Sequence, residues 1–337
     1  MPLRLLQLVL CGFAPALTQG LRPSAGCGGS ADPGPLPPTD QPISRNINVT
    51  DAHFKHVKRR YVLHVPPGYS AAGPPAPLQM YFHMQDESPE DAEITEFVRL
   101  GNAHSAFTVY PEAHKAGGTA DTQCGPAWNV GVLGNLSDTC TRQTWSMYGC
   151  NAQNDGYSCT CCHSSCRHLG LCTDAGAGAG CLWSACYSDV AFVEAILAEL
   201  ATEFCIDLDA QFATGASNGG MLVHTIAAQL PTAFAAVAPI YGLPLAGHQS
   251  VPAVLANVSI LEIHDRWDEV IPLKGGQSNE GWLYTPLANT TAAWAAAKGC
   301  SNLAATAAVT TPIEFDSRFL ACSRYAHCSD DVMVRRS

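Results

Sequence analysis

One pentapeptide, GASNG at 215–219, limits the possible folds more than any other stretch of this 337-residue chain. A short apolar run at 212–214 precedes it, and an amphipathic helical pattern at 221–230 follows it. Small residues around a serine fit a sharp turn from a strand directly into a helix, because larger side chains would collide there. The pentapeptide therefore predicts an α/β architecture with Ser217 at the end of a strand.

Short runs of β-branched and aromatic residues recur along the chain and are typical of buried strands. They lie at 60–65, 78–83, 107–110, 212–214, 235–240, 259–264 and 332–335. Helical patterns separate several of these runs, and at 189–204 the apolar residues follow the spacing of one helix face. Strands that alternate with helices predict a mainly parallel sheet with helices on both faces.

The first 20 residues have the pattern of a secretory signal peptide, with one basic residue, an apolar stretch at 5–17 and small residues after it. That stretch is shorter than the ~20 residues that a membrane span needs, so we expect no transmembrane helix. The 16 cysteines are usual as disulfides in an oxidising compartment. Four N-glycosylation sequons agree with export; they begin at Asn48, Asn135, Asn257 and Asn289. The sequence therefore predicts a secreted, extracellular protein.

Composition divides the rest of the chain into two parts, and the second part contains an insertion. Residues 21–44 are rich in Pro, Gly and Ser, which predicts a disordered linker, and 45–337 is long enough for one large domain. Within that domain, 124–186 holds ten cysteines and almost no periodic apolar pattern, which indicates a disulfide-stapled insertion. The crowded Cys and His residues at 159–168 resemble zinc ligands, but in a secreted chain they pair more often as disulfides, so we expect no metal.

The charge of the chain bears on its partners. The formal net charge is -11, with only 18 Lys and Arg residues. A phosphate backbone needs an electropositive surface, which this composition does not provide. We therefore expect no nucleic-acid partner.

A serine hydroxyl at such a turn needs a histidine base that a carboxylate orients. In this arrangement the acid follows the serine along the chain, and Asp268 lies in the loop after the strand expected at 259–264. Asp265 and Glu269 are competing candidates for the acid. Trp128 is a candidate for stacking on an aromatic acyl group or a sugar ring, or alternatively a core residue.

An oxyanion at this turn would need backbone donors from two segments. The N–H of Asn218, at the expected helix start, is the first donor. The second is expected from the loop after the strand at 78–83, at Met84 or Gln85.

With these residues in place, the chain resembles the secreted esterase family of feruloyl esterases, acetyl xylan esterases and polyhydroxybutyrate depolymerases over roughly 60–335. The most specific matches are AWNVG at 127–131, SDVAF at 188–192, GASNGGM at 215–221 and the stretch 264–272. The resemblance implies an α/β-hydrolase fold, with Ser217 as nucleophile and Asp268 as triad acid. It also implies hydrolysis of an ester on a plant-wall polysaccharide or a polyester, with no metal or organic cofactor.

The chain departs from that family at three places. Family members usually carry His-Gly where this chain has His-Met at 83–84 and His-Asp at 264–265. The family histidine lies in a Gly-Gly-His segment after the last strand, and this sequence ends without such a segment. We therefore expect the chain to be C-terminally truncated. His327 follows Asp268 and is our candidate base; chain order permits it, although it precedes the strand expected at 332–335.

Two further alternatives stay open. Without its usual histidine, the chain is alternatively a non-catalytic binding protein that keeps the hydrolase scaffold. Removal of Cys11 with the signal leaves an odd number of cysteines, so one thiol lacks a partner. Cys300 and Cys328 resemble a C-terminal pair of the family, which leaves Cys27, Cys205 or Cys322 as the unpaired residue.

Overall fold

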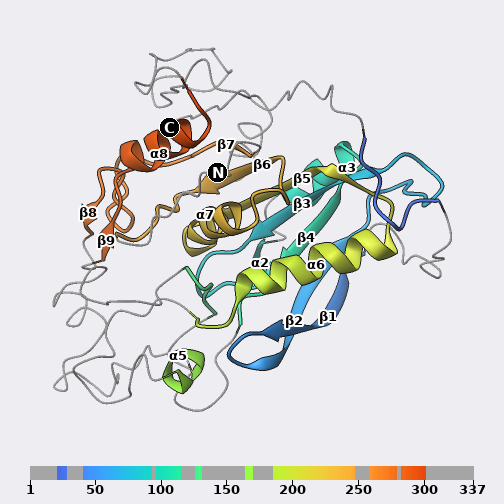
Figure 1. The fold of residues 1–337 in the computed structure, drawn as a ribbon, viewed down its shortest axis with the longest axis horizontal. Helices are drawn as coiled ribbons and strands as arrows, with labels where there is room; N and C mark the ends of the chain where they lie inside the picture. Colours follow the sequence, from blue (N-terminus) through green and yellow to red (C-terminus); the bar gives the residue numbers. More distant parts are fainter. Residues whose placement is uncertain are drawn as a thin grey trace.

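The computed structural model describes residues 21–28, 41–92, 96–114, 126–130, 164–169, 185–246, 258–278 and 282–300. In this part of the chain, a seven-stranded sheet has the order β1-β2-β4-β3-β5-β6-β7 (Figure 1). The strands are β1 (Ile43–Asp51), β2 (Lys55–His64), β3 (Ala76–Phe82), β4 (Phe107–Pro111), β5 (Ile206–Ala216), β6 (Ala236–Ile240) and β7 (Ser259–Ile260). In sheet order, β4, β3, β5, β6 and β7 pair in parallel. The pairs β1 with β2 and β2 with β4 are antiparallel. The prediction of a mainly parallel sheet is confirmed.

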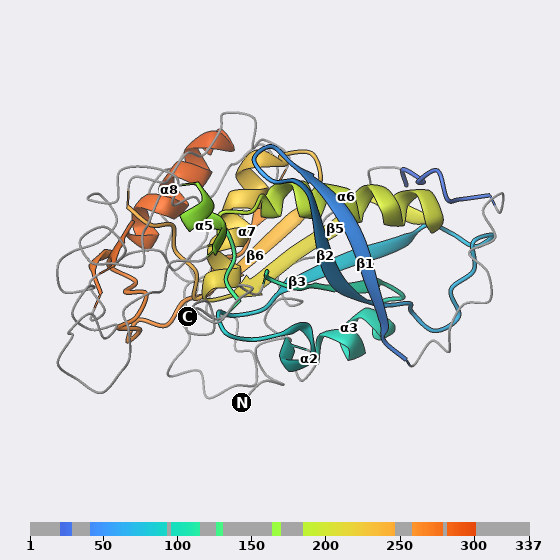
Figure 2. The same ribbon diagram turned by 90° about the horizontal axis from the view of Figure 1, so that it is seen from below.

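Helices cover both faces of this sheet, as predicted. The helices are α2 (Pro89–Ala92), α3 (Phe97–Ala103), α5 (Ser164–His168), α6 (Asp189–Glu203), α7 (Asn218–Gln229) and α8 (Leu287–Ala297). Figure 2 shows α6 and α7 on one face and α2 and α3 on the other. The helices predicted at 189–204 and 221–230 correspond to α6 and α7, although α7 begins three residues earlier.

The alternation of side chains along the strands builds a separate apolar core on each face. On β3, Met80 and Phe82 pack with residues of α6 and α7, whereas Tyr81 packs on the opposite side with Phe97 of α3. All of these side chains are buried. The two cores fix the sheet between its helices and thereby fix the end of β5 that leads into α7.

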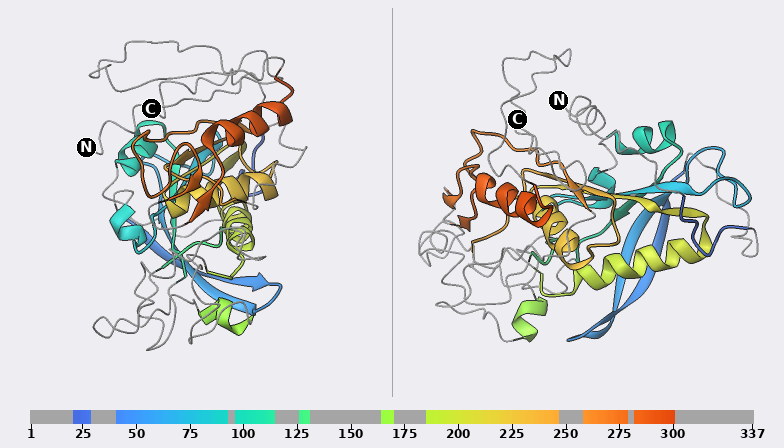
Figure 3. Two further views of the ribbon diagram at one scale, coloured as in Figure 1. Left: turned by 90° about the vertical axis from the view of Figure 1, so that its left-hand side faces the viewer. Right: turned by 45° about the horizontal axis from the view of Figure 1, so that its top comes forward.

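The C-terminal part of the described chain lies beyond β6 and β7. A two-stranded sheet of β8 (Gly276–Gln277) and β9 (Leu283–Tyr284) precedes α8. Figure 3 shows α8 beside α7 from two directions. The ring centroids of Trp294 in α8 and His224 in α7 are 6.4 Å apart, so these two side chains join the helices.

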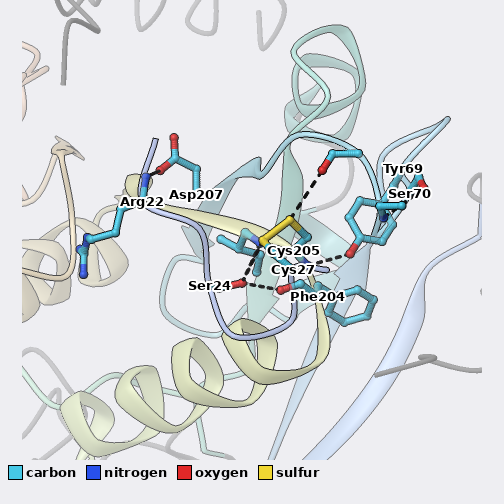
Figure 4. Close-up of a disulfide and its surroundings, with 11 residues drawn as sticks. Arg22, Ser24, Cys27, Tyr69, Ser70, Phe204, Cys205 and Asp207 are labelled. Atoms are coloured by element: carbon cyan, nitrogen blue, oxygen red, sulfur yellow. Dashed lines mark hydrogen bonds between the residues drawn. A yellow bond between two sulfur atoms is a disulfide. The ribbon is translucent and has the colours of Figure 1, made fainter. Parts of the chain in front are cut away.

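The expectation of a disordered linker over 21–44 is wrong at both of its ends. Residues 21–28 lie against the start of β5, where Cys27 and Cys205 form a disulfide (Figure 4). Ser24 Oγ donates to the Phe204 carbonyl at 2.7 Å and accepts the Ile206 N–H at 2.9 Å. Residues 43 and 44 already belong to β1. Long-range bonds to β5 hold the first segment, and composition does not reveal them.

The structure also removes two candidates for the unpaired cysteine, because Cys27 and Cys205 pair with each other. In the expected insertion at 124–186, Cys166 of α5 pairs with Cys186. Cys300 is disulfide-bonded as well. The remaining residues of the insertion, and the strand predicted at 332–335, lie largely outside the described residues.

Candidate active site

Ser217 occupies a sharp turn between β5 and α7. Its backbone angles are φ 53° and ψ -121°. A non-glycine residue rarely adopts a positive φ, and such strain persists only where the surroundings impose it. Here the Ser217 N–H donates to the Ile240 carbonyl at 2.8 Å, while the Ser217 carbonyl accepts the Met221 N–H at 2.9 Å. One bond to β6 and one within the first turn of α7 thus fix the backbone of Ser217.

Close packing explains why the residues around Ser217 are small. A Cβ atom on Gly219 would overlap the carbonyl oxygens of Phe82 and His83, and one on Gly215 would lie 2.7 Å from the Gly219 backbone. The first turn of α7 therefore approaches the end of β3 more closely than any side chain would allow. Ser217 itself is half-buried, so the residue keeps some exposure to solvent at the end of β5.

Asn218, the first residue of α7, is held by Trp128. The Trp128 N–H donates to Asn218 Oδ1 at 2.8 Å, and the Trp128 indole Nε1–H donates to the His83 carbonyl at 2.8 Å. Trp128 is completely buried and packs edge-on against Phe82. Its burial corrects the prediction of a substrate-stacking residue: Trp128 braces Asn218 against the end of β3.

His83 is a structural residue in this site. The Ala113 N–H donates to His83 Nε2 at 3.0 Å, so this nitrogen carries no proton. The proton is therefore on Nδ1, which donates to the Met84 carbonyl at 2.6 Å. Both ring nitrogens are engaged, which leaves His83 unable to serve as a base for Ser217.

Met84 and Gln85, the two residues expected to supply the second oxyanion donor, differ in how their N–H groups are bonded. The Met84 N–H donates to Glu87 Oε2 at 3.0 Å, and Asp86, which has a positive φ of 63°, donates its N–H to the Pro126 carbonyl at 3.0 Å. Burial raises the pKa of Glu87, against the lowering effect of the Met84 N–H. Among the described residues no acceptor is found for the Gln85 N–H. Of Met84 and Gln85, only Met84 has its N–H bonded to a described acceptor.

Asp268 is a firmly held carboxylate in the loop that follows the bridge between Ile240 and Ile263. Its Oδ1 accepts the N–H groups of Val270 and Ile271 at 2.9 and 2.8 Å. Its Oδ2 lies 3.7 Å from His264 Nε2, beyond hydrogen-bond distance. That nitrogen donates instead to the Ile271 carbonyl at 2.6 Å. Two backbone bonds thus orient Asp268 and leave Oδ2 able to accept a bond from a histidine.

The competing acids have different surroundings. Asp265 is exposed and accepts the Trp267 N–H at 2.9 Å, which closes the turn before Asp268. Glu269 is exposed. Burial, together with the carboxylates of Asp265 and Asp268, raises the pKa of Tyr241. Tyr241 directly follows Ile240, whose carbonyl accepts the Ser217 N–H.

A buried ion pair supports the segment that holds Asn218, and the sequence did not predict this pair. Asp189 begins α6; its Oδ1 lies 2.7 Å from Arg59 Nη2, and its Oδ2 accepts the Asn129 N–H at 2.6 Å. Both charged side chains are only 2% exposed. Asn129 follows Trp128, so the pair anchors the segment that holds Asn218. The SDVAF stretch at 188–192 was the available signal, but the spacing of its residues does not reveal this partner.

The remaining predicted residues are not part of this arrangement. Asn48 is exposed on β1 and Asn289 is exposed on α8. Asn135, Asn257 and His327 lie outside the described residues. No helix in the described ranges is long and apolar enough to cross a membrane. Within the same ranges, no three histidine, cysteine or acidic residues gather as metal ligands would.

Comparison with known proteins agrees with this geometry. No family model matches the chain. A solved acetyl xylan esterase from Aspergillus awamori superimposes with a TM-score of 0.51 at 11% identity, over 88% of this chain and 92% of that one. The chain has the α/β-hydrolase fold. In that fold the strand–Ser217–helix turn lies where a nucleophile elbow is found.

Two curated relatives match a shorter segment of this chain. A probable feruloyl esterase C from Aspergillus niger is 34% identical over 88 residues, and feruloyl esterase C from Emericella nidulans is 35% identical over 88 residues. Each match covers 26% of this chain and 32% of the relative. The chain therefore spans about a third of the length of the curated relatives that it matches.

Proposed function

We propose that this chain is a secreted carboxylic ester hydrolase that forms an acyl intermediate on Ser217. The observation that carries the proposal is the positive φ of Ser217 between β5 and α7, with Asn218 at the helix start. Such a turn presents the hydroxyl to a substrate and directs backbone amides toward the carbonyl oxygen. In the first step Ser217 Oγ attacks the ester carbonyl carbon. The resulting oxyanion accepts hydrogen bonds from the N–H groups of Asn218 and Gln85.

The proton from Ser217 passes to a histidine, which then gives it to the leaving alcohol. Water repeats the sequence on the acyl-serine and releases the carboxylic acid. In our proposal Asp268 orients that histidine through Oδ2, and the histidine is His327, which follows Asp268 in chain order. The bonds that engage His83 and His264 support this choice, because neither ring has a nitrogen shown to face Ser217.

The substrate that we propose is an ester on a plant-wall polysaccharide, of the feruloyl or acetyl type, or a polyester. The partial match to feruloyl esterase C supports the first class. The disulfides of Cys27 with Cys205 and of Cys166 with Cys186 support secretion. Exposed Asn48 and the other three sequons would then carry glycans, and the reaction needs no metal or organic cofactor.

A second function belongs to a different class. The engaged rings of His83 and His264 favour a hydrolase-fold protein that binds an ester-bearing or related glycan without turning it over. In that case the oxyanion loop and Asp268 would be retained for their structural bonds alone.

Hydrolysis of 4-nitrophenyl acetate by purified, disulfide-intact protein separates the two functions. We expect turnover by the wild type, a loss of about 10³-fold or more in kcat for Ser217→Ala, and a large loss for Asp268→Asn. Glu269→Gln is the matched control, because this exposed carboxylate lies one residue away and should leave the rate unchanged. Equal rates for Ser217→Ala and wild type would refute the proposal, and folded protein that binds oligosaccharide without turnover would establish the second function.

A further inference from the structure

The exposed apolar side chains of this protein are unevenly distributed. Among the described residues, three large apolar side chains are exposed: Leu21, Met84 and Trp267. Trp267 is the most exposed of them, at 74%. An isolated exposed leucine needs no explanation, but an indole left in water is unusual enough to suggest a ligand.

Met84 and Trp267 lie on opposite sides of Ser217. In the sheet β3 and β6 are the two neighbours of β5. Met84 follows β3, whereas Trp267 follows the bridge between Ile240 and Ile263, which extends the sheet beyond β6. Since parallel strands end at one edge, both loops border the edge where Ser217 stands. The leucine lies at the other end of β5, roughly 30 Å away for a strand of this length.

The backbone of Trp267 is held in place, and one face of its indole contacts a cation. Its backbone N–H donates to Asp265 Oδ1, and the next residue, Asp268, is anchored by two backbone bonds. The Arg266 guanidinium lies over the Trp267 ring, 4.8 Å from its centroid. A cation on one face of an indole leaves the opposite face for a ligand. An aromatic side chain has few rotatable bonds and loses little conformational freedom when it binds.

We propose that Trp267 determines which ester this protein accepts, by stacking on a flat ring that the substrate carries near its reacting carbonyl. The proposal rests on the proposed esterase function. The shared chemistry is a ring face, either an aromatic acyl group or the C–H face of a pyranose, against which an indole can stack. Met84, flexible and polarizable, would contact the same substrate from the β3 side.

Selectivity between esters tests this role. Values of kcat/KM are measured for methyl cinnamate and an acetylated xylo-oligosaccharide, each relative to ethyl acetate, which has no ring. We expect Trp267→Ala to lower at least one of these ratios about 10-fold, and Trp267→Phe to restore most of it. The ratio that falls identifies the ring as acyl or sugar. Leu21→Ala removes a comparable exposed side chain far from Ser217 and should change neither ratio.

Ratios that do not change in Trp267→Ala, or that fall equally in Leu21→Ala, would overturn the proposal. A second measurement does not depend on turnover. In a Ser217→Ala background, calorimetry with methyl cinnamate and with xylotriose compares Trp267 with Trp267→Ala. For the ligand whose ring stacks, we expect Trp267→Ala to raise Kd about 10-fold. If Trp267→Ala leaves Kd unchanged for both ligands, the proposal is overturned. Absence of hydrolysis by the wild type would instead reject the esterase function alone.

Discussion

Removing the carboxylate of Asp189 should destabilise this protein much more than removing a similar carboxylate at the other end of the same helix. Asp189 begins α6 and pairs with Arg59 of β2; Glu203 ends α6 and pairs with Arg45 of β1. Both ion pairs have N···O distances of 2.7 Å. The two differ in burial, because the Asp189 pair is 2% exposed on each side and the Glu203 pair is 24% and 26% exposed.

The expected magnitude follows from what Asp189→Ala leaves behind. The Arg59 guanidinium would keep its bond to the Glu112 carbonyl and its position over the Phe192 ring, but it would have no counter-charge at 2% exposure. The Asn129 N–H would also lose its acceptor. Breaking a buried pair from one side costs about 3–5 kcal/mol, whereas a partly exposed pair is worth about 1 kcal/mol or less.

Urea unfolding followed by tryptophan fluorescence, with the disulfides intact, measures these free energies. Asp189→Ala should lose about 3–5 kcal/mol and Glu203→Ala about 1 kcal/mol or less. The double variant Asp189→Leu with Arg59→Met should be more stable than Asp189→Ala, because it leaves no uncompensated charge. Equal losses for Asp189→Ala and Glu203→Ala would refute this reasoning. A double variant that is no more stable than Asp189→Ala would refute it as well.

Three further predictions concern other parts of the molecule. Gly219→Ala should abolish ester hydrolysis, since its Cβ would overlap the Phe82 and His83 carbonyls; kcat comparable to wild type in folded protein would contradict the packing. The hydrogen bonds from Arg60 lower the pKa of Glu90 to about 2, so stability from this pair is present above the usual pKa and is lost as pH falls toward 2. Acid titration of Glu90→Gln should therefore show a smaller decline over that range, by less than about 1 kcal/mol because the carboxylate is exposed; an identical titration would contradict it. His224 Nε2 lies 3.2 Å from Glu262 Oε2 in the core, so His224→Leu should cost about 1–3 kcal/mol by removing the polar neighbour of that carboxylate, and adding Glu262→Leu should recover part of the loss in the same urea assay.

Local sequence patterns predicted the central sheet because its parallel strands are buried on both faces. Strands β3, β4 and β6 are nearly continuous runs of buried residues, and such runs are visible without knowing their neighbours. The edge strand β1 was not predicted because it is not buried in this way. Most of its residues alternate between half-buried and exposed, and Asn46 and Asn48 interrupt the apolar pattern that a buried strand would show.

Long-range bonds set the limit of sequence analysis in this protein. The disulfide between Cys27 and Cys205 joins residues 178 positions apart, and it orders a segment whose composition predicts disorder. The site divides in the same way. The turn at Ser217 is encoded by adjacent small residues, whereas the burial of Trp128 and its bond to Asn218 depend on how separate segments pack.

The central claim is that Ser217 is an activated nucleophile, and covalent labelling tests it most directly. Folded, disulfide-intact protein is treated with a fluorophosphonate at neutral pH, and the adduct is located by peptide mass spectrometry. We predict one label per chain, on Ser217, that disappears in Ser217→Ala and forms much more slowly in Asp268→Asn. No label on Ser217 in folded wild-type protein, or a label on another residue, would contradict the claim.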